Sequence, residues 1–163
     1  MRSWADICAD KSLQDLPYKI ETNRFDQIVM SPASFWHSGF QGDITALMLK
    51  LMQGGRVQPE CPIQTTDGIK VPDVVWISAD RLRPHRRAVT LPIAPEICVE
   101  VISPGNRQYE MVAKMQLYFA QGAQEVWLCD EEGNMQFFLH DSAEPTAQSR
   151  LCPEFPKRIE WAE

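Results

Sequence analysis

The sequence has 163 residues, of which 44% are hydrophobic and 23% are charged, and this composition is typical of one globular domain spanning residues 1–163. It excludes a disordered or fibrous chain, because a chain of this size buries about 70% of its unfolded surface. Sixteen Lys and Arg residues against 22 Asp and Glu residues give a net charge of −6. This charge argues against general electrostatic attraction to phosphate backbones.

The five cysteines are widely spaced and odd in number. Their pattern predicts neither a disulfide framework nor a structural zinc site, and those within apolar runs are expected to be small core residues. No apolar run approaches the roughly 18 residues of a membrane span. We therefore expect a soluble, cytoplasmic protein with no membrane partner.

Periodicity, capping residues and turns divide the chain into strands and helices. Ser34 follows Pro32 as a helix N-cap, and apolar residues then recur at intervals of three and four until Gly54 and Gly55 end the helix. The polar segment 78–95 contains three prolines and predicts a loop. The other expected elements, in chain order, are strands at 18–22 and 27–30, a helix at 35–52, strands at 56–62, 69–77 and 97–102, a helix at 108–121, strands at 125–129 and 135–140, and a last short strand at 158–161.

Two acidic residues interrupt strands that are otherwise apolar. Asp73 precedes a Val-Val-Trp run, and Glu100 lies within Ile-Cys-Val-Glu-Val-Ile. Each is costly there if it is ionised and unpaired, so each is expected to have a partner. The next helix presents Glu110, Lys114 and Tyr118 four residues apart on one face. A right-handed crossover to a parallel strand places this helix over the sheet, with Lys114 toward Glu100.

Two carboxylates and a lysine are the groups that metal-assisted hydrolysis of a phosphodiester requires. Asp73, Glu100 and the backbone carbonyl of Val101 supply hard oxygen ligands to Mg²⁺ or Mn²⁺. Lys114 would orient the attacking water or stabilise the developing charge. Arginines close to these motifs in sequence are candidate phosphate contacts around the cleft, namely Arg81, Arg83, Arg86, Arg87 and Arg107.

The order and spacing of these motifs resemble the Uma2 family of restriction-endonuclease-like proteins, within the PD-(D/E)XK nuclease superfamily. The resemblance covers about residues 18–140. It implies an α/β (α+β) fold with a restriction-endonuclease-like core, in which helices flank a central mixed β-sheet. The residues that carry it are VPDVV at 71–75, VEVISP at 99–104, Lys114 with Tyr118, and GAQEVWLCD at 122–130.

The resemblance also implies roles for single residues. Asp73 and Glu100 match the acidic metal ligands of the superfamily motif. The lysine that normally stands two residues after the second acid is replaced by Ile102, and Lys114 on the following helix is the matching lysine. Supporting positions around the site are Gln41, His37, Glu110, as a partner of Lys114, and Tyr118.

The sequence is compatible with three functions. The first is a Mg²⁺- or Mn²⁺-dependent endonuclease that hydrolyses DNA, with weak, salt-dependent binding; a homodimer is compatible with it. The second is a non-catalytic nucleic-acid-binding or assembly protein on the same fold, which Ile102 and the acidic charge favour. A third alternative is a small-ligand or nucleotide-binding domain. It is the weakest of the three, because Gly54-Gly55 lacks the lysine and the spacing of a phosphate-binding loop.

Overall fold

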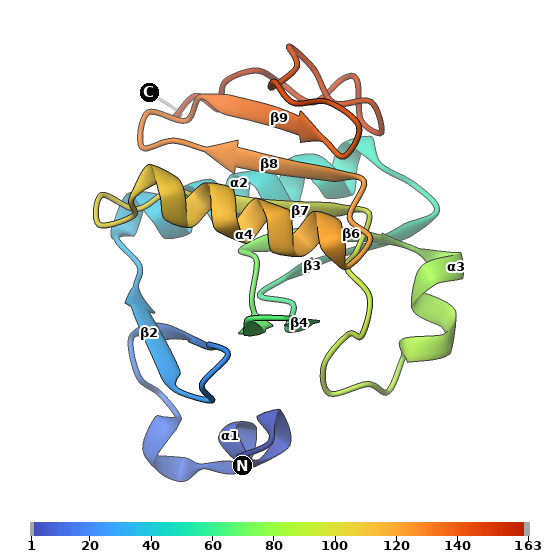
Figure 1. Ribbon diagram of the computed structural model, residues 1–163. Coiled ribbons are helices and arrows are strands. Elements are labelled where there is room, and N and C mark those ends of the chain that lie inside the picture. The colour runs from blue at the N-terminus through green and yellow to red at the C-terminus, as the bar shows by residue number, and fades with distance from the viewer. Residues whose placement is uncertain (1, 162–163) are drawn as a thin grey trace.

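A computed structural model describes residues 2–161, and a mixed five-stranded sheet forms its centre (Figure 1). The strand order is β3-β6-β7-β8-β9; β7 and β8 are parallel, and the other neighbours are antiparallel. The predicted mixed sheet is thereby confirmed. Its strands are β3 (Gly55–Pro59), β6 (Val74–Ser78), β7 (Ile97–Val101), β8 (Glu125–Cys129) and β9 (Met135–Leu139).

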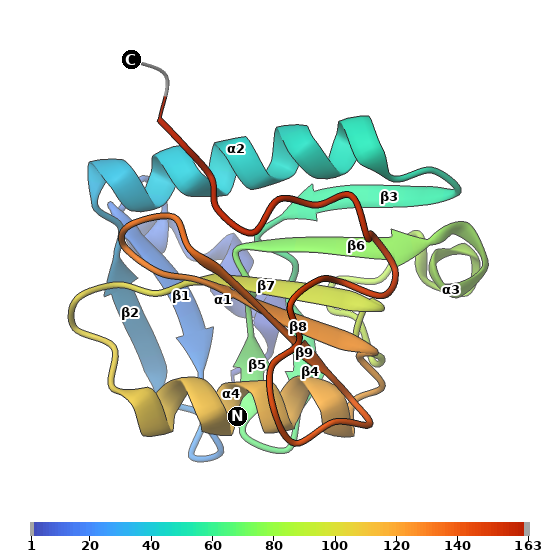
Figure 2. The same cartoon turned by 90° about the horizontal axis from the view of Figure 1, so that it is seen from above.

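The two long helices lie on opposite faces of this sheet (Figure 2). Helix α2 (Phe35–Leu51) begins at Ser34, whose side chain accepts a hydrogen bond from the His37 amide. Helix α4 (Gln108–Ala120) connects the parallel strands β7 and β8, as the predicted crossover requires. Within residues 2–161, no helix is long and apolar enough to cross a membrane.

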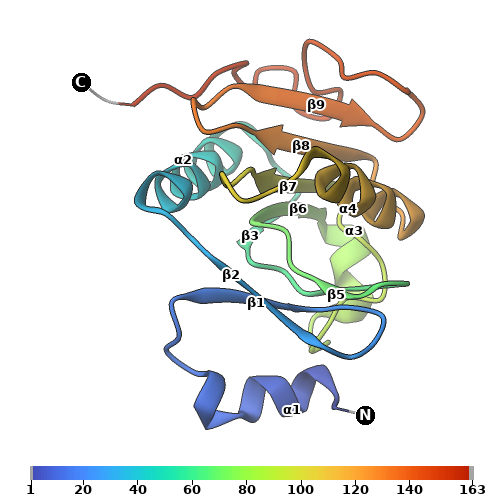
Figure 3. The ribbon, with the colours of Figure 1, turned by 60° about the vertical axis from the view of Figure 1, so that its left-hand side comes forward.

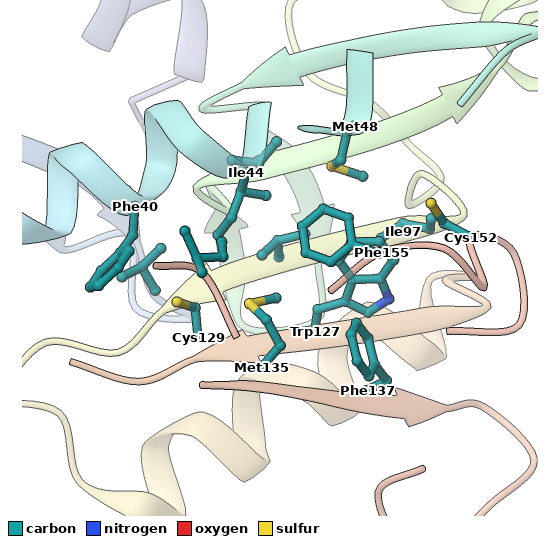
Figure 4. Close-up of a cluster of buried hydrophobic side chains, with 14 residues drawn as sticks. Phe40, Ile44, Met48, Ile97, Trp127, Cys129, Met135, Phe137, Cys152 and Phe155 are labelled. Carbon is teal, nitrogen blue, oxygen red and sulfur yellow. The ribbon is translucent and has the colours of Figure 1, made fainter. Parts of the chain in front are cut away.

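The face under α2 holds an aromatic core (Figure 4). Phe40 and Ile44 of α2 are fully buried there, together with Trp127 of β8. The Trp127 and Phe155 ring centroids lie 4.6 Å apart, within the range of favourable aromatic pairs. Because Phe155 belongs to the C-terminal segment, that segment and α2 cover the same face of the sheet.

The face under α4 holds a second core. Because side chains alternate along a strand, successive residues of β7 point into one core and then the other. Val99 and Val101 belong to the core under α2, whereas Cys98 and Ile102 pack in the core under α4. Glu100 alternates with Val99 and Val101, so its side chain points toward α4. The acid that interrupts this strand therefore faces the helix that carries the predicted lysine.

Smaller elements complete the fold, and the hairpin β1–β2 lies beside β5 with α1 beyond it (Figure 3). Strands β1 and β2, which correspond to the strands predicted at 18–22 and 27–30, pair antiparallel, and β4 pairs with β5. These elements are α1 (Trp4–Ala9), η1 (Lys11–Leu13), β1 (Tyr18–Thr22), β2 (Ile28–Pro32), β4 (Ile63–Thr65), β5 (Gly68–Lys70), α3 (Ala79–Leu82) and η2 (Arg83–His85).

The prediction of one continuous strand over 69–77 is wrong. The segment forms β5 and β6 with a break at Val71–Asp73. Pro72 has no amide hydrogen to donate to a sheet, and the Asp73 carbonyl accepts hydrogen bonds from the Glu60 amide (3.1 Å) and the Gln41 side chain (3.0 Å). Asp73 thus precedes the strand instead of lying inside it.

Two other expectations also need correction. The segment 78–95 is not simply a loop, because Ser78 caps the short helix α3 by accepting a hydrogen bond from the Arg81 amide. The last predicted strand, at 158–161, is reduced to an isolated bridge between Asn134 and Arg158.

The cysteines are free thiols, as the spacing predicted. Cys61, Cys98, Cys129 and Cys152 are buried, and Cys8 is exposed. Burial raises the pKa of Cys61 to about 12, so this thiol stays protonated at neutral pH. The four buried cysteines are core residues.

A buried carboxylate fixes the C-terminal segment to the sheet. Glu125 is 1% exposed, and its oxygens accept hydrogen bonds from the Trp127 indole (2.7 Å) and the Ser149 hydroxyl (2.6 Å). They also accept from the amides of Arg150 and Leu151, both at 2.8 Å. These four hydrogen bonds compensate for the loss of water around the carboxylate, whose burial without partners would be costly.

Replacing this carboxylate is expected to destabilise the fold. Glu125→Ala leaves four buried or half-buried donors without their acceptor and should lower the free energy of unfolding by about 3 kcal/mol, measured by urea denaturation. Glu154→Ala, which removes an exposed carboxylate of the same C-terminal segment, is the control and should change it by less than about 0.5 kcal/mol. Equal effects of the two substitutions would contradict an anchoring role for Glu125.

Candidate active site

A cavity of about 810 Å³ opens between the hairpin β1–β2, the first turns of α2 and the loop before α4. Asp73, Glu100 and Lys114 all line it, so the structure brings the three predicted site residues together. His37 and Gln41 of α2 line the same cavity. The candidate site therefore lies where β6 begins and β7 ends, since these neighbouring strands are antiparallel.

Asp73 is held by the main chain and by two cationic or polar side chains. One carboxylate oxygen, Oδ2, accepts a hydrogen bond from the Val101 amide at 2.7 Å and lies 3.3 Å from His37 Nε2. The other, Oδ1, accepts from Lys19 Nζ at 3.1 Å. Burial raises the pKa of Asp73, but the His37 hydrogen bond and the Lys19 charge outweigh it and hold the pKa below its ordinary value. Asp73 is therefore ionised at neutral pH.

Glu100 is 3% exposed and lies between two lysines. Its Oε1 accepts a hydrogen bond from the Tyr118 hydroxyl at 2.6 Å and lies 3.0 Å from Lys114 Nζ. Its Oε2 lies 3.3 Å from Lys19 Nζ. Burial raises the pKa of Glu100 above its ordinary value, although the charges of Lys114 and Lys19 oppose this shift. The predicted approach of Lys114 to Glu100 is confirmed.

Glu21 is a third buried carboxylate that the sequence analysis missed. Its Oε1 lies 3.0 Å from Lys114 Nζ, and its Oε2 accepts a hydrogen bond from the Val71 amide at 2.6 Å. Burial raises the pKa of Glu21, but the charges of Lys114 and Lys19 outweigh this effect and lower it overall. Lys114 is thus fixed between two carboxylates, one from β1 and one from β7.

Lys19 is the second residue that the sequence analysis missed. It lies two residues before Glu21 on β1, so both side chains project from the same side of the strand toward the site. Burial lowers the pKa of Lys19, but the charges of Glu100 and Asp73 outweigh it and raise the pKa above its ordinary value. We call the five residues the ion-pair network, which runs in the order Glu21, Lys114, Glu100, Lys19, Asp73.

Glu110 does not pair with Lys114, contrary to the sequence-based prediction. Its carboxylate accepts a hydrogen bond from the Arg107 amide at 3.1 Å and so caps the start of α4. Glu110 is exposed, whereas Lys114 points into the cavity. Glu21 holds the position next to Lys114 that the prediction gave to Glu110.

The four arginines of segment 81–87 lie away from the site, and the prediction that they surround the cleft is wrong. Asp73 precedes β6 and Ser78 ends it, which separates them by about 17 Å at roughly 3.3 Å per residue. Arg81 donates to the carbonyls of Ala94 (2.8 Å) and Gly122 (2.9 Å). The residues concerned, none of which lines the cavity, are Arg81, Arg83, Arg86 and Arg87.

Arg107 is the one predicted phosphate contact that adjoins the site. It follows Asn106, which lines the cavity, and precedes the first turn of α4. Its guanidinium lies 6.0 Å from the ring centre of Tyr109.

Ile102, at the position where the superfamily motif has its lysine, is a packing residue. It packs in the apolar core under that helix, on the face of β7 that Glu100 also uses. Lys114 reaches Glu100 from the opposite side of the same interlayer space. The side chains of Lys114 and Ile102 therefore both lie in the layer between α4 and the sheet, but only Lys114 contacts Glu100 there.

The carboxylates present a partial ligand set for a divalent cation. Asp73 Oδ1 and Glu100 Oε2 already converge on one cation, the Lys19 ammonium, and Val101 lines the same cavity. Among residues 2–161, no cluster of three or more His, Cys, Asp or Glu side chains forms a metal-binding group. Two carboxylates fit Mg²⁺, which commonly uses one or two carboxylates and completes its shell with water and substrate phosphate.

Comparisons with known proteins agree with this fold. The family model Uma2, described as "Putative restriction endonuclease", matches residues 12–158. The chain also resembles the crystal structure of a putative nuclease belonging to DUF820 from Anabaena variabilis ATCC 29413, with a TM-score of 0.68 and 19% identity. That match covers 88% of this chain and 82% of the other. No curated protein matches the sequence.

The two acids are expected to respond differently to removal of their charge. Asp73→Asn should lower the free energy of unfolding at pH 7 by about 2 kcal/mol, because the ionised carboxylate accepts charge-assisted hydrogen bonds. Glu100→Gln should leave it unchanged or raise it, because a raised pKa means that folding disfavours the ionised form. Urea denaturation with a metal chelator present measures both.

The pH dependence has opposite signs at the two positions. The lowered pKa of Asp73 stabilises the fold above the unfolded value of 3.8, and this contribution is lost as the pH falls below it. The raised pKa of Glu100 costs stability as the pH rises above the unfolded value of 4.5. Asp73→Asn should therefore flatten the acid limb of the stability curve below pH 4. A larger loss at pH 7 from Glu100→Gln than from Asp73→Asn would contradict this assignment.

Proposed function

We propose that this chain, which belongs to the Uma2 family, is a nuclease that hydrolyses phosphodiester bonds of DNA with the help of Mg²⁺ or Mn²⁺. One observation carries the proposal: Asp73 and Glu100 both contact the same ammonium, that of Lys19, and Lys114 lies beside Glu100 in an open cavity. The family's description as a restriction endonuclease supports the same reaction class.

Asp73 and Glu100 would hold the ion through Oδ1 and Oε2, the oxygens that contact Lys19 Nζ, and the Val101 carbonyl is the proposed third ligand. The bound ion would polarise the phosphoryl oxygen and lower the pKa of a water molecule. The chain orients both acids without the ion, because the Val101 amide fixes Asp73 and the Tyr118 hydroxyl fixes Glu100. Such fixed donors limit the reorganisation that ion binding requires.

Lys114 is the proposed catalytic cation. Glu21 and Glu100, each 3.0 Å from its Nζ, hold the ammonium at the cavity wall. Near a phosphodiester in the cavity, this charge would orient the attacking water or stabilise negative charge on the phosphoryl oxygens. Glu21 thus acts as a positioning residue.

The same geometry supports an alternative, a non-catalytic nucleic-acid-binding or assembly protein. The observation in its favour is electrostatic: Lys19 and Lys114 are both paired with carboxylates, and the residues that line the cavity include no arginine. With a net charge of −6, binding to DNA should be weak and strongly dependent on salt. Cleavage of both strands of a duplex would need two such sites, as in a homodimer.

An assay with supercoiled plasmid and single-stranded DNA tests the proposal. In Mn²⁺ or Mg²⁺ the wild type should nick or degrade the substrate, and Asp73→Ala and Glu100→Ala should fall to background because each removes a metal ligand. Lys114→Met should slow cleavage by about 100-fold or more, as loss of a charge-stabilising group does elsewhere. Lys50→Met removes an exposed lysine from α2 and should retain the wild-type rate.

The same experiment separates the two functions. Wild-type cleavage no faster than that of the Asp73 and Glu100 variants would reject the nuclease for these substrates. Retained binding of labelled DNA under those conditions would then support the non-catalytic alternative.

A further inference from the structure

Each acid of the site has one oxygen that the protein holds with a neutral donor and one oxygen that contacts Lys19. Asp73 Oδ2 accepts from the Val101 amide, and Glu100 Oε1 accepts from the Tyr118 hydroxyl. The remaining oxygens, Asp73 Oδ1 and Glu100 Oε2, are the ones that a metal ion would use. Both contact Lys19 Nζ, at 3.1 and 3.3 Å.

The ammonium and a divalent ion therefore compete for one place. Mg²⁺ lies about 2.0–2.1 Å from its oxygen ligands. An ion that bridges the same two oxygens from the side on which Lys19 Nζ lies would be inside the contact distance of the ammonium. Like charges at that separation repel strongly. Lys19 has to move when the ion enters.

Lys19 is able to leave without disturbing the central sheet. It belongs to β1, which pairs with β2 in a separate two-stranded sheet and not with β6 or β7. Its side chain is 13% exposed and lines the open cavity, and a lysine stem has several rotatable bonds. A rotamer change would carry the ammonium toward the cavity while the strand stays paired.

We infer that Lys19 sets the metal affinity of this site: its ammonium holds the position of the ion in the metal-free protein and has to withdraw before Mg²⁺ or Mn²⁺ binds. The inference rests on the proposed metal-dependent function. In the metal-free state the ammonium lies between two buried carboxylates, which otherwise repel each other. In the metal-bound state it gives up both contacts, and this loss weakens binding of the ion.

Direct measurement of Mn²⁺ binding tests the inference without a cleavage assay. Chelator-treated wild type, Lys19→Met and Lys19→Arg are titrated with Mn²⁺ and followed by the electron paramagnetic resonance signal of the free ion. Lys19→Met should bind at least 10-fold more tightly than the wild type, because the competing charge is gone. Lys19→Arg keeps the charge and should stay within about 3-fold of the wild type. Lys11→Met, which removes an exposed lysine of η1, should bind like the wild type.

Two further variants keep the result interpretable. Lys19→Gln replaces Lys19→Met if the methionine variant fails to fold, since glutamine can donate a hydrogen bond to either carboxylate. Adding Glu100→Gln to Lys19→Met should abolish the tight binding, which locates the ion at these two acids.

The possible outcomes separate the inference from the proposed function. Tighter Mn²⁺ binding by Lys19→Met supports the inference even if no variant cleaves DNA, in which case the proposed activity fails alone. Binding no tighter than that of a wild type that does cleave DNA overturns the inference and leaves the nuclease intact. Absence of Mn²⁺ binding in every variant overturns both.

Discussion

Three carboxylates are buried close together in this protein, and the two lysines between them make that burial tolerable. Isolated buried charges cost several kcal/mol each, but here negative and positive groups alternate from Glu21 to Asp73. The members come from β1, α4, β7 and the turn before β6. The network therefore connects the hairpin and the helix to the central sheet. The same ion pairs that arrange the site also fix how these elements pack.

The structure also explains which parts of the site could be predicted from the sequence. Asp73 and Glu100 lie beside or within apolar strands, where a charge is conspicuous, and Lys114 follows from the crossover rule together with the helical stripe that it shares with Tyr118. Lys19 and Glu21 lie in a short strand of mixed polarity, in which burial does not alternate along the chain. They become buried only when the hairpin packs beside the site, and the sequence around them contains no pattern that predicts this contact.

The arginines of segment 81–87 illustrate the opposite error, in which closeness in sequence was taken for closeness in space. Strand β6 separates Asp73 from Ser78, and the segment that follows Ser78 begins at the far end of the sheet. The hydrogen bonds of Arg81 to the carbonyls of Ala94 and Gly122 give it a structural role there. Prediction of the fold class followed from the family resemblance of the motifs, whereas prediction of these side chains needed the direction of one strand.

The net negative charge of the chain extends to the site itself. With all five groups ionised, the ion-pair network carries one excess negative charge, so the metal-free cavity offers little attraction to phosphate. A divalent ion would reverse that excess to one positive charge, and the withdrawal of Lys19 would free an ammonium in the same cavity. On the proposed function, metal binding and attraction of a phosphodiester are therefore coupled through the same charges. A site that already holds its own cation between the two acids gains affinity for an anion only after that cation has been displaced.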